Sequence, residues 1–127
     1  MARVLVAEDE PAVREFVVRA LQHARHEVVA VEDGQQALER LVDGRYDLLV
    51  TDIVMPHLDG IALALKATRD WPAMAVLLMT GYPAERQRAF NLDELIDRVI
   101  LKPFTLDQFL SAIGAALARK TGSERKL

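Results

Sequence analysis

Four short apolar runs in this chain each end at a polar residue that can take part in chemistry. An acidic cluster at residues 8–10 follows the first run, and Asp52, Thr80 and Lys102 follow three later runs. Continuous apolar runs of this length are typical of strands that are buried on both faces of a parallel sheet. Because the carboxyl ends of parallel strands meet at one edge, we expect all four groups to converge there. The sequence therefore predicts a pocket that binds a metal ion and a phosphoryl group around a carboxylate nucleophile.

Helical patterns separate the apolar runs, so that strands and helices alternate along the chain. The expected strands are residues 4–7, 28–31, 48–52, 75–79 and 99–101, and the expected helices begin near Pro11, Asp33, Asp59, Pro83 and Thr105. Such alternation favours right-handed crossovers and a parallel sheet with helices on both faces. Small doubly wound sheets commonly have the strand order 2-1-3-4-5. We therefore predict a five-stranded, flavodoxin-like α/β fold with five helices and the third strand in the centre.

The expected helices carry local signals at their first residues. Pro11 suits the first helical position because it lacks the backbone N–H that would be unsatisfied there. Asp33 with Gln36, and Thr105 with Gln108, have the spacing of a capping box, in which two side chains satisfy backbone N–H groups at a helix start. These signals predict where the loops before the helices end.

Length and composition limit the domain count and the class of partner. A chain of 127 residues suits one domain, which we expect over residues 1–119, followed by a charged, disordered tail at 120–127. The net charge of −3 gives no attraction to nucleic acid or to an anionic membrane. The chain has no cysteine, no apolar stretch of the roughly 20 residues that span a bilayer, and no signal-peptide pattern. We expect a soluble, cytoplasmic protein.

The expected pocket contains the groups that phosphoryl transfer needs. Acids at residues 8–10 beside Asp52 repel one another, and a hard cation such as Mg²⁺ relieves this repulsion through oxygen ligands. A carboxylate near Mg²⁺ can attack phosphorus to form an aspartyl phosphate, while Lys102 supplies positive charge and Thr80 a hydroxyl donor. A simpler interpretation of the acidic cluster is favourable charge at a helix N-terminus.

These residues, taken in order, resemble the receiver domain of two-component response regulators. The resemblance spans about residues 2–119 and rests on Ala7-Glu8-Asp9-Glu10, Asp52-Ile53-Val54-Met55-Pro56 with Asp59-Gly60, Thr80-Gly81 and Lys102-Pro103-Phe104-Thr105. It implies a CheY-like fold and a signalling role, in which a histidine kinase or phosphotransfer protein donates a phosphoryl group. It also implies a receiver that catalyses its own phosphorylation and dephosphorylation rather than a conventional enzyme.

The resemblance assigns roles to the residues of the predicted metal site. It makes Asp52 the phosphoacceptor and a metal ligand, and Glu8 and Asp9 the acidic pair, with Asp9 the direct ligand. The backbone carbonyl of Val54 would complete the protein's share of the Mg²⁺ ligands.

The resemblance also assigns the residues that bind the phosphoryl group and switch the domain. Thr80 matches the switch hydroxyl, Lys102 matches the family's lysine, and Pro103 matches the proline that follows it through a cis bond. Val99 occupies a position where the family often has tyrosine or phenylalanine. Tyr82 is therefore a candidate to take over the coupling or to tune access of the hydrolytic water.

Two other functions fit part of the pattern. An aspartyl-nucleophile phosphatase usually has a second acid two residues after the nucleophile, but that position is Val54. A flavodoxin-like ligand-binding module needs a Gly-rich or hydroxyl-rich phosphate loop after the first strand, and the acidic cluster stands there instead. The receiver interpretation is therefore favoured.

The downstream partner is expected to be a protein, because the sequence shows no output domain after the receiver. The motifs also resemble the CpdR-type single-domain regulators of alphaproteobacteria, which steer regulated proteolysis, so the proteolysis machinery is a candidate partner. We expect a monomer or a weak homodimer.

Overall fold

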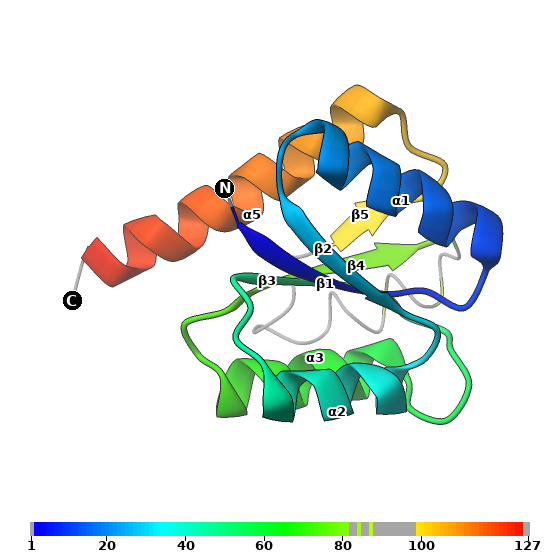
Figure 1. Ribbon diagram of the computed structural model, residues 1–127, viewed down its shortest axis with the longest axis horizontal. Coiled ribbons are helices and arrows are strands. Elements are labelled where there is room, and N and C mark those ends of the chain that lie inside the picture. Colours follow the sequence, from blue (N-terminus) through cyan, green and yellow to red (C-terminus); the bar gives the residue numbers. More distant parts are fainter. Residues whose placement is uncertain (1, 82–83, 85–86, 88–98, 126–127) are drawn as a thin grey trace.

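The computed structural model describes residues 2–81, 84, 87 and 99–125, and the side chains as far as residue 118. In this part of the chain five parallel strands form one sheet in the order β2-β1-β3-β4-β5 (Figure 1). The strands are β1 (Arg3–Ala7), β2 (Glu27–Val31), β3 (Leu48–Asp52), β4 (Ala75–Thr80) and β5 (Val99–Leu101). The predicted fold class and strand order are confirmed.

Helices cover both faces of the sheet. Four helices lie in the described part of the chain: α1 (Pro11–His23), α2 (Gly34–Asp43), α3 (Gly60–Asp70) and α5 (Leu106–Arg125). Figure 1 shows α1 and α5 on one face and α2 and α3 on the other. The fifth expected helix, over residues 83–96, falls almost wholly outside the described residues.

Alternate residues of each strand face opposite sides of the sheet, so each strand contributes to two cores. Leu5 and Leu49 pack with α2 and α3, whereas Val4 and Val50 pack with α1 and α5. All four side chains are fully buried. This explains the continuous apolar runs in the sequence, because a strand covered on both faces needs apolar residues at successive positions.

Side chains cap the helices at the predicted places. The Asp33 carboxylate accepts the N–H of Gln36 at 2.8 Å, and Asp59 caps the start of α3 in the same way. Thr105 and Gln108 form a reciprocal capping box, with distances of 2.8 and 3.1 Å. Since α3 and α5 begin directly after loops at the carboxyl edge of the sheet, their caps fix the ends of those loops.

The last helix is longer than the sequence indicated. The backbone of α5 is helical as far as Arg125 and continues past residue 119, where we expected the domain to end. The disorder expected for residues 120–127 stays a prediction. In the described part of the chain, no helix is both long and apolar enough to cross a membrane.

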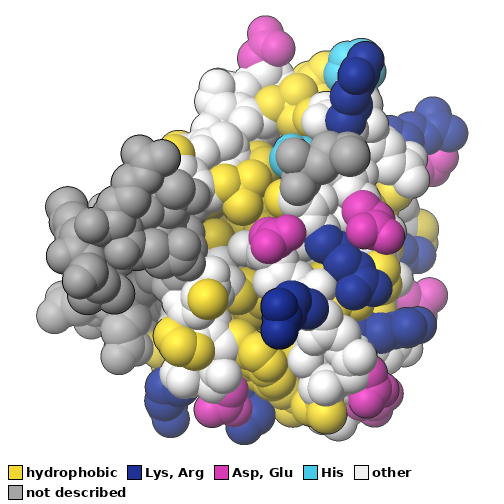
Figure 2. All heavy atoms as spheres, turned by 60° about the vertical axis from the view of Figure 1, so that its left-hand side comes forward, with side chains coloured by type: hydrophobic (Ala, Val, Ile, Leu, Met, Phe, Trp, Pro, Cys, Tyr) yellow, Lys and Arg dark blue, Asp and Glu magenta, His cyan; other side chains and the backbone are white. Residues whose placement is uncertain are grey.

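Figure 2 turns the left-hand side of Figure 1 forward, the side from which the end of α5 projects. Among the described side chains visible on this face, lysine and arginine are interspersed with aspartate and glutamate. The charges on this face are therefore mixed and do not gather into a patch of one sign.

Candidate functional site

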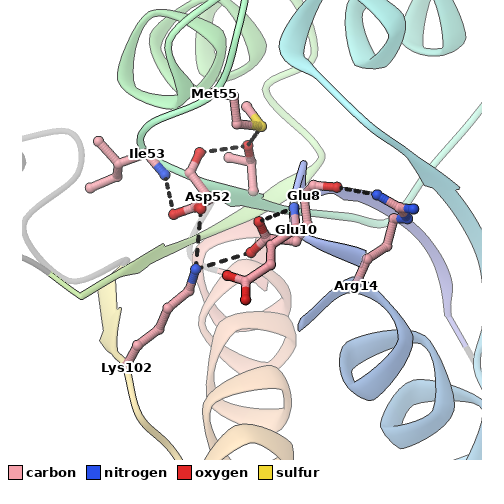
Figure 3. Close-up of polar contacts among 8 residues, drawn as sticks. Glu8, Glu10, Arg14, Asp52, Ile53, Met55 and Lys102 are labelled. Atoms are coloured by element: carbon pink, nitrogen blue, oxygen red, sulfur yellow. Dashed lines mark hydrogen bonds and ion pairs between the residues drawn. The ribbon is translucent and has the colours of Figure 1, made fainter. Parts of the chain in front are cut away.

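The carboxyl edge of the sheet brings together the groups that the sequence placed after its apolar runs. Asp52 is the last residue of β3 and Thr80 the last residue of β4. Glu8 follows β1 directly, and Lys102 follows β5 directly. Because β3 is central, Asp52 has the acidic cluster on one side and Lys102 on the other (Figure 3).

Lys102 bridges two carboxylates across the sheet edge. Its Nζ lies 3.0 Å from Glu8 Oε1 and 3.1 Å from Asp52 Oδ2. Glu8 is fully buried, and the other two side chains are largely buried. Charge-assisted hydrogen bonds of this length are strong where water is excluded. The lysine therefore holds together two acids that would otherwise repel each other.

The backbone around Asp52 is packed tightly against the start of α3. The second carboxylate oxygen, Oδ1, accepts the N–H of Ile53 at 2.9 Å. Gly60 donates its N–H to the Ile53 carbonyl at 2.7 Å, and a Cβ at Gly60 would collide with the carbonyl oxygen of Asp52. The Thr51 hydroxyl donates to the same Asp52 carbonyl at 2.9 Å. These contacts hold the Asp52 backbone in place, and the Ile53 N–H and Lys102 hold its carboxylate.

Glu8 is held by its backbone as well as by its side chain. Its N–H donates to the carbonyl of Val31 at 3.1 Å, and its Oε2 accepts the N–H of Glu10 at 3.1 Å. Its carbonyl accepts a hydrogen bond from Nη1 of Arg14 at 2.9 Å (Figure 3). The acidic loop after β1 is therefore anchored to β2 and to α1.

Burial and repulsion change the protonation of this cluster. Burial, followed by the charge of Asp52, raises the pKa of Glu8 to about 7 against the opposing effects of the Glu10 N–H and of Lys102. Burial lowers the pKa of Lys102, but the hydrogen bond to Glu8 and the charges of both carboxylates outweigh it, so that the pKa of Lys102 is raised. Near neutral pH the lysine therefore stays charged, beside a Glu8 carboxyl group that is only partly ionised.

The donor set fits a hard divalent cation. Carboxylate oxygens of Glu8, Asp9 and Asp52 lie within 4.8 Å of one another, with Glu8 buried, Asp9 exposed and Asp52 between the two. Within the described residues this is the one group of three such side chains. Mg²⁺ takes oxygen ligands and keeps several of its waters, and an exposed Asp9 leaves room for them. Burial and the charge of Asp52 raise the pKa of Glu8, and a bound cation would neutralise that charge.

An open cavity of about 960 Å³ adjoins these carboxylates. Its polar end is lined by Asp9, Asp52 and Lys102, together with Val54. Its apolar end is lined by side chains of α1 and of the loop before α5, Ala12, Val13, Phe16, Pro103 and Phe104. The cavity is large enough for a phosphoryl group and for part of the molecule that donates it.

The remaining predicted residues lie on β4, on β5 or just after β5, or fall outside the described residues. The Thr80 side chain is fully buried, and its carbonyl accepts the N–H of Lys102 at 2.7 Å. Val99 is half-buried and packs against the core beneath α2 and α3. The peptide bond between Lys102 and Pro103 is cis. Tyr82 lies outside the described residues, so its expected coupling stays a prediction.

Sequence reasoning missed Arg14, which reaches the acidic loop from α1. It included Gly60 in the receiver motif but gave it no role, and the structure shows that Gly60 allows α3 to approach Asp52. The arginine had no local signal, because its acceptor is a backbone carbonyl.

Comparison with known sequences agrees with this geometry. The family model for the response regulator receiver domain matches residues 4–114. The response regulator receiver protein CpdR of Brucella abortus is 40% identical over 116 residues, which cover 89% of this chain and 94% of that protein. The response regulator MprA of Mycolicibacterium vanbaalenii is 33% identical over 119 residues, 94% of this chain but 52% of that protein. The chain thus spans about half the length of MprA and nearly all of CpdR.

Solved structures show the same fold. The chemotaxis response regulator CheY4 of Vibrio cholerae superposes with a TM-score of 0.82 at 26% identity, covering 92% of this chain and 99% of that one. The response regulator TrrA of Thermotoga maritima, solved in complex with Mg²⁺-BeF, gives a TM-score of 0.81 at 29% identity, covering 92% of this chain and 100% of that one. The chain therefore belongs to the response regulator receiver domain family and is a phosphorylation-dependent signalling receiver.

Proposed function

We propose that Asp52 accepts the phosphoryl group. The observation that carries this assignment is the position of its carboxylate, which lies at the end of the central strand with one oxygen on the Ile53 N–H and the other on Lys102. In the transfer, an Asp52 oxygen forms a bond to phosphorus while the bond from phosphorus to the donor's imidazole nitrogen breaks. That nitrogen keeps the electron pair and takes up a proton.

Glu8, Asp9, Asp52 and the carbonyl of Val54 would hold Mg²⁺ in this proposal. Three carboxylates within 4.8 Å support it, as does the Mg²⁺-BeF complex of TrrA. When bound, the ion would neutralise charge on the phosphoryl oxygens. Glu8 would act through its fixed, buried carboxylate, and exposed Asp9 would offer its oxygens directly.

Lys102 and Thr80 would stabilise the phosphorylated state. The Lys102 ammonium lies next to Asp52 already, so it needs only a small movement to pair with a phosphoryl oxygen. Thr80 lies at the end of the adjacent strand, where a hydroxyl can donate to the same group. Thr80 is the last residue of β4, and Gly81 and Tyr82 follow it along the chain. We therefore expect the structural change caused by phosphorylation to pass along this segment toward residues 83–96. Tyr82→Ala should then make partner binding less dependent on phosphorylation.

A receiver domain exchanges phosphoryl groups with a histidine kinase or phosphotransfer protein. The output of this chain would be phosphorylation-dependent binding of another protein, and its similarity to CpdR over most of both chains supports this form of output. A component of the proteolysis machinery is the candidate target. A pull-down with untreated and with beryllofluoride-treated protein would identify partners that prefer one state. The similar proteins described above are response regulators, so they give no support to the phosphatase and flavodoxin-like alternatives.

The assignment of Asp52 can be tested with a small phosphodonor and intact-protein mass spectrometry. With acetyl phosphate and Mg²⁺, the wild-type protein should gain one acid-labile phosphoryl group, and Asp52→Asn should gain none. Asp43→Asn is a matched control, because Asp43 is exposed at the end of α2, and it should be labelled as the wild type is. Undiminished labelling of folded Asp52→Asn would show that another residue accepts the group.

A further inference from the structure

The proposed transfer gives no role to Arg14, although this residue is tied to the acidic loop. Its guanidinium Nη1 donates to the carbonyl of Glu8 at 2.9 Å, and its side chain is only 22% exposed. The arginine lies in α1, six residues along the chain from its acceptor. It therefore connects a rigid helix to the loop that carries two of the three clustered carboxylates (Figure 3).

The acceptor of this bond lies in the peptide unit between Glu8 and Asp9. The N–H of Glu8 is held by the Val31 carbonyl and the side chain by Glu10 and Lys102. The carbonyl is held by Arg14. The orientation of a peptide plane places the next Cα and so limits the directions in which the next side chain can leave the backbone. Arg14 thus restrains the direction of Asp9, the exposed member of the cluster.

The second contact of Arg14 is weaker. Its Nη2 lies 3.9 Å from the carboxylate of Glu32, whose side chain is 68% exposed. Ion pairs that are this long and this exposed contribute little. The bond to the Glu8 carbonyl is therefore the contact through which Arg14 acts.

We propose that Arg14 is a positioning residue for Mg²⁺ binding, which orients the Glu8–Asp9 peptide so that both carboxylates face the ion. This inference rests on the proposed function, because it assumes that the cluster binds Mg²⁺. For a variant without Arg14, it predicts a change in Mg²⁺ affinity opposite to the change expected from electrostatics alone. Removing a positive charge near an acidic cluster should strengthen cation binding, whereas loss of the restraint should weaken it.

Isothermal titration calorimetry of Mg²⁺ against five proteins separates the two effects. Arg14→Ala should raise the Kd for Mg²⁺ about tenfold, in the range seen when groups that orient metal ligands are removed. Arg14→Lys keeps the charge and one donor and should recover part of the affinity. Arg19→Ala, which removes an exposed arginine of the same helix, and Glu32→Gln should bind Mg²⁺ as the wild type does.

Phosphorylation by acetyl phosphate at varied Mg²⁺ concentration gives a second readout. In Arg14→Ala the Mg²⁺ concentration that gives half the maximal rate should rise about tenfold, while the rate at saturation should stay within about twofold. A role in stability alone would lower the melting temperature without moving the Mg²⁺ dependence. If Arg14→Ala does not fold, Arg14→Lys replaces it in both measurements, and we expect a smaller increase in the Kd for Mg²⁺.

Two outcomes would overturn the inference in distinguishable ways. Equal or tighter Mg²⁺ binding by folded Arg14→Ala, with normal binding by the wild type, would refute the positioning role and leave the proposed function intact. Absence of Mg²⁺ binding by the wild type would refute both.

Discussion

Replacing Glu8 with glutamine should change how the stability of the metal-free protein depends on pH. The pKa of Glu8 is raised to about 7 in the folded protein, from an ordinary value of 4.5. Between these values the folded chain keeps a proton that the unfolded chain releases. The stability from this group is therefore fully present below about pH 4.5 and is lost as the pH rises through about 7. Glutamine cannot ionise, so the variant lacks this loss.

The size of the effect follows from the two pKa values. Each tenfold change in proton affinity corresponds to about 1.4 kcal/mol, so a rise from 4.5 to about 7 is worth about 3 kcal/mol. The Glu8 side chain is fully buried, so that solvent does not screen the penalty. Glutamine has nearly the same shape and can still accept the N–H of Glu10. Lys102 attracts the ionised form of Glu8, and this attraction is already included in the pKa of about 7, so it adds no further dependence on pH.

Urea denaturation in EDTA between pH 4.5 and 8 measures the effect. The single tryptophan, Trp71, packs against the core beneath α2 and α3 and reports unfolding by fluorescence. The free energy of unfolding of Glu8→Gln minus that of the wild type should increase by about 3 kcal/mol over this range. Glu39→Gln changes an exposed glutamate of α2 and should follow the wild type. If the Glu8→Gln and wild-type curves are parallel, burial does not hold a proton on Glu8.

Three further substitutions test other parts of the structure. Asp9→Asn should abolish Mg²⁺ binding in calorimetry without loss of stability, because it removes one ligand charge from a self-repelling cluster; an unchanged Kd would contradict this. Gly60→Ala should cost about 1–3 kcal/mol in urea denaturation and slow phosphorylation, because its methyl group meets the Asp52 carbonyl. Gly114→Ala, with open space around it in α5, is the control and should be neutral or stabilising. Phe109→Ala should lower the free energy of unfolding by about 3–5 kcal/mol, since this ring is fully buried. A decrease under about 1 kcal/mol would contradict this and show that neighbouring side chains fill the space left by the ring.

The fold could be predicted because its signals are local. Residues buried on both faces of a sheet must be apolar at successive positions, and helix starts need side chains that accept backbone N–H groups. The strand ending at Asp52, the helix cap at Asp33 and the capping box at Thr105 are therefore visible in short segments. The stretch at residues 83–96 is polar and gives weaker signals. The helix expected there falls almost wholly outside the described residues, as does Tyr82.

The sequence by itself determined which chemical groups reach the carboxyl edge of the sheet, because the end of each strand is marked by its neighbours along the chain. Only the tertiary structure decided how those groups meet. Lys102 lies 94 residues along the chain from Glu8 and 50 from Asp52, yet it contacts both. The raised pKa of Glu8 depends on burial by distant segments. The bond from Arg14 ends on a backbone carbonyl, a group that every residue carries, so nothing in the sequence marks which carbonyl is used.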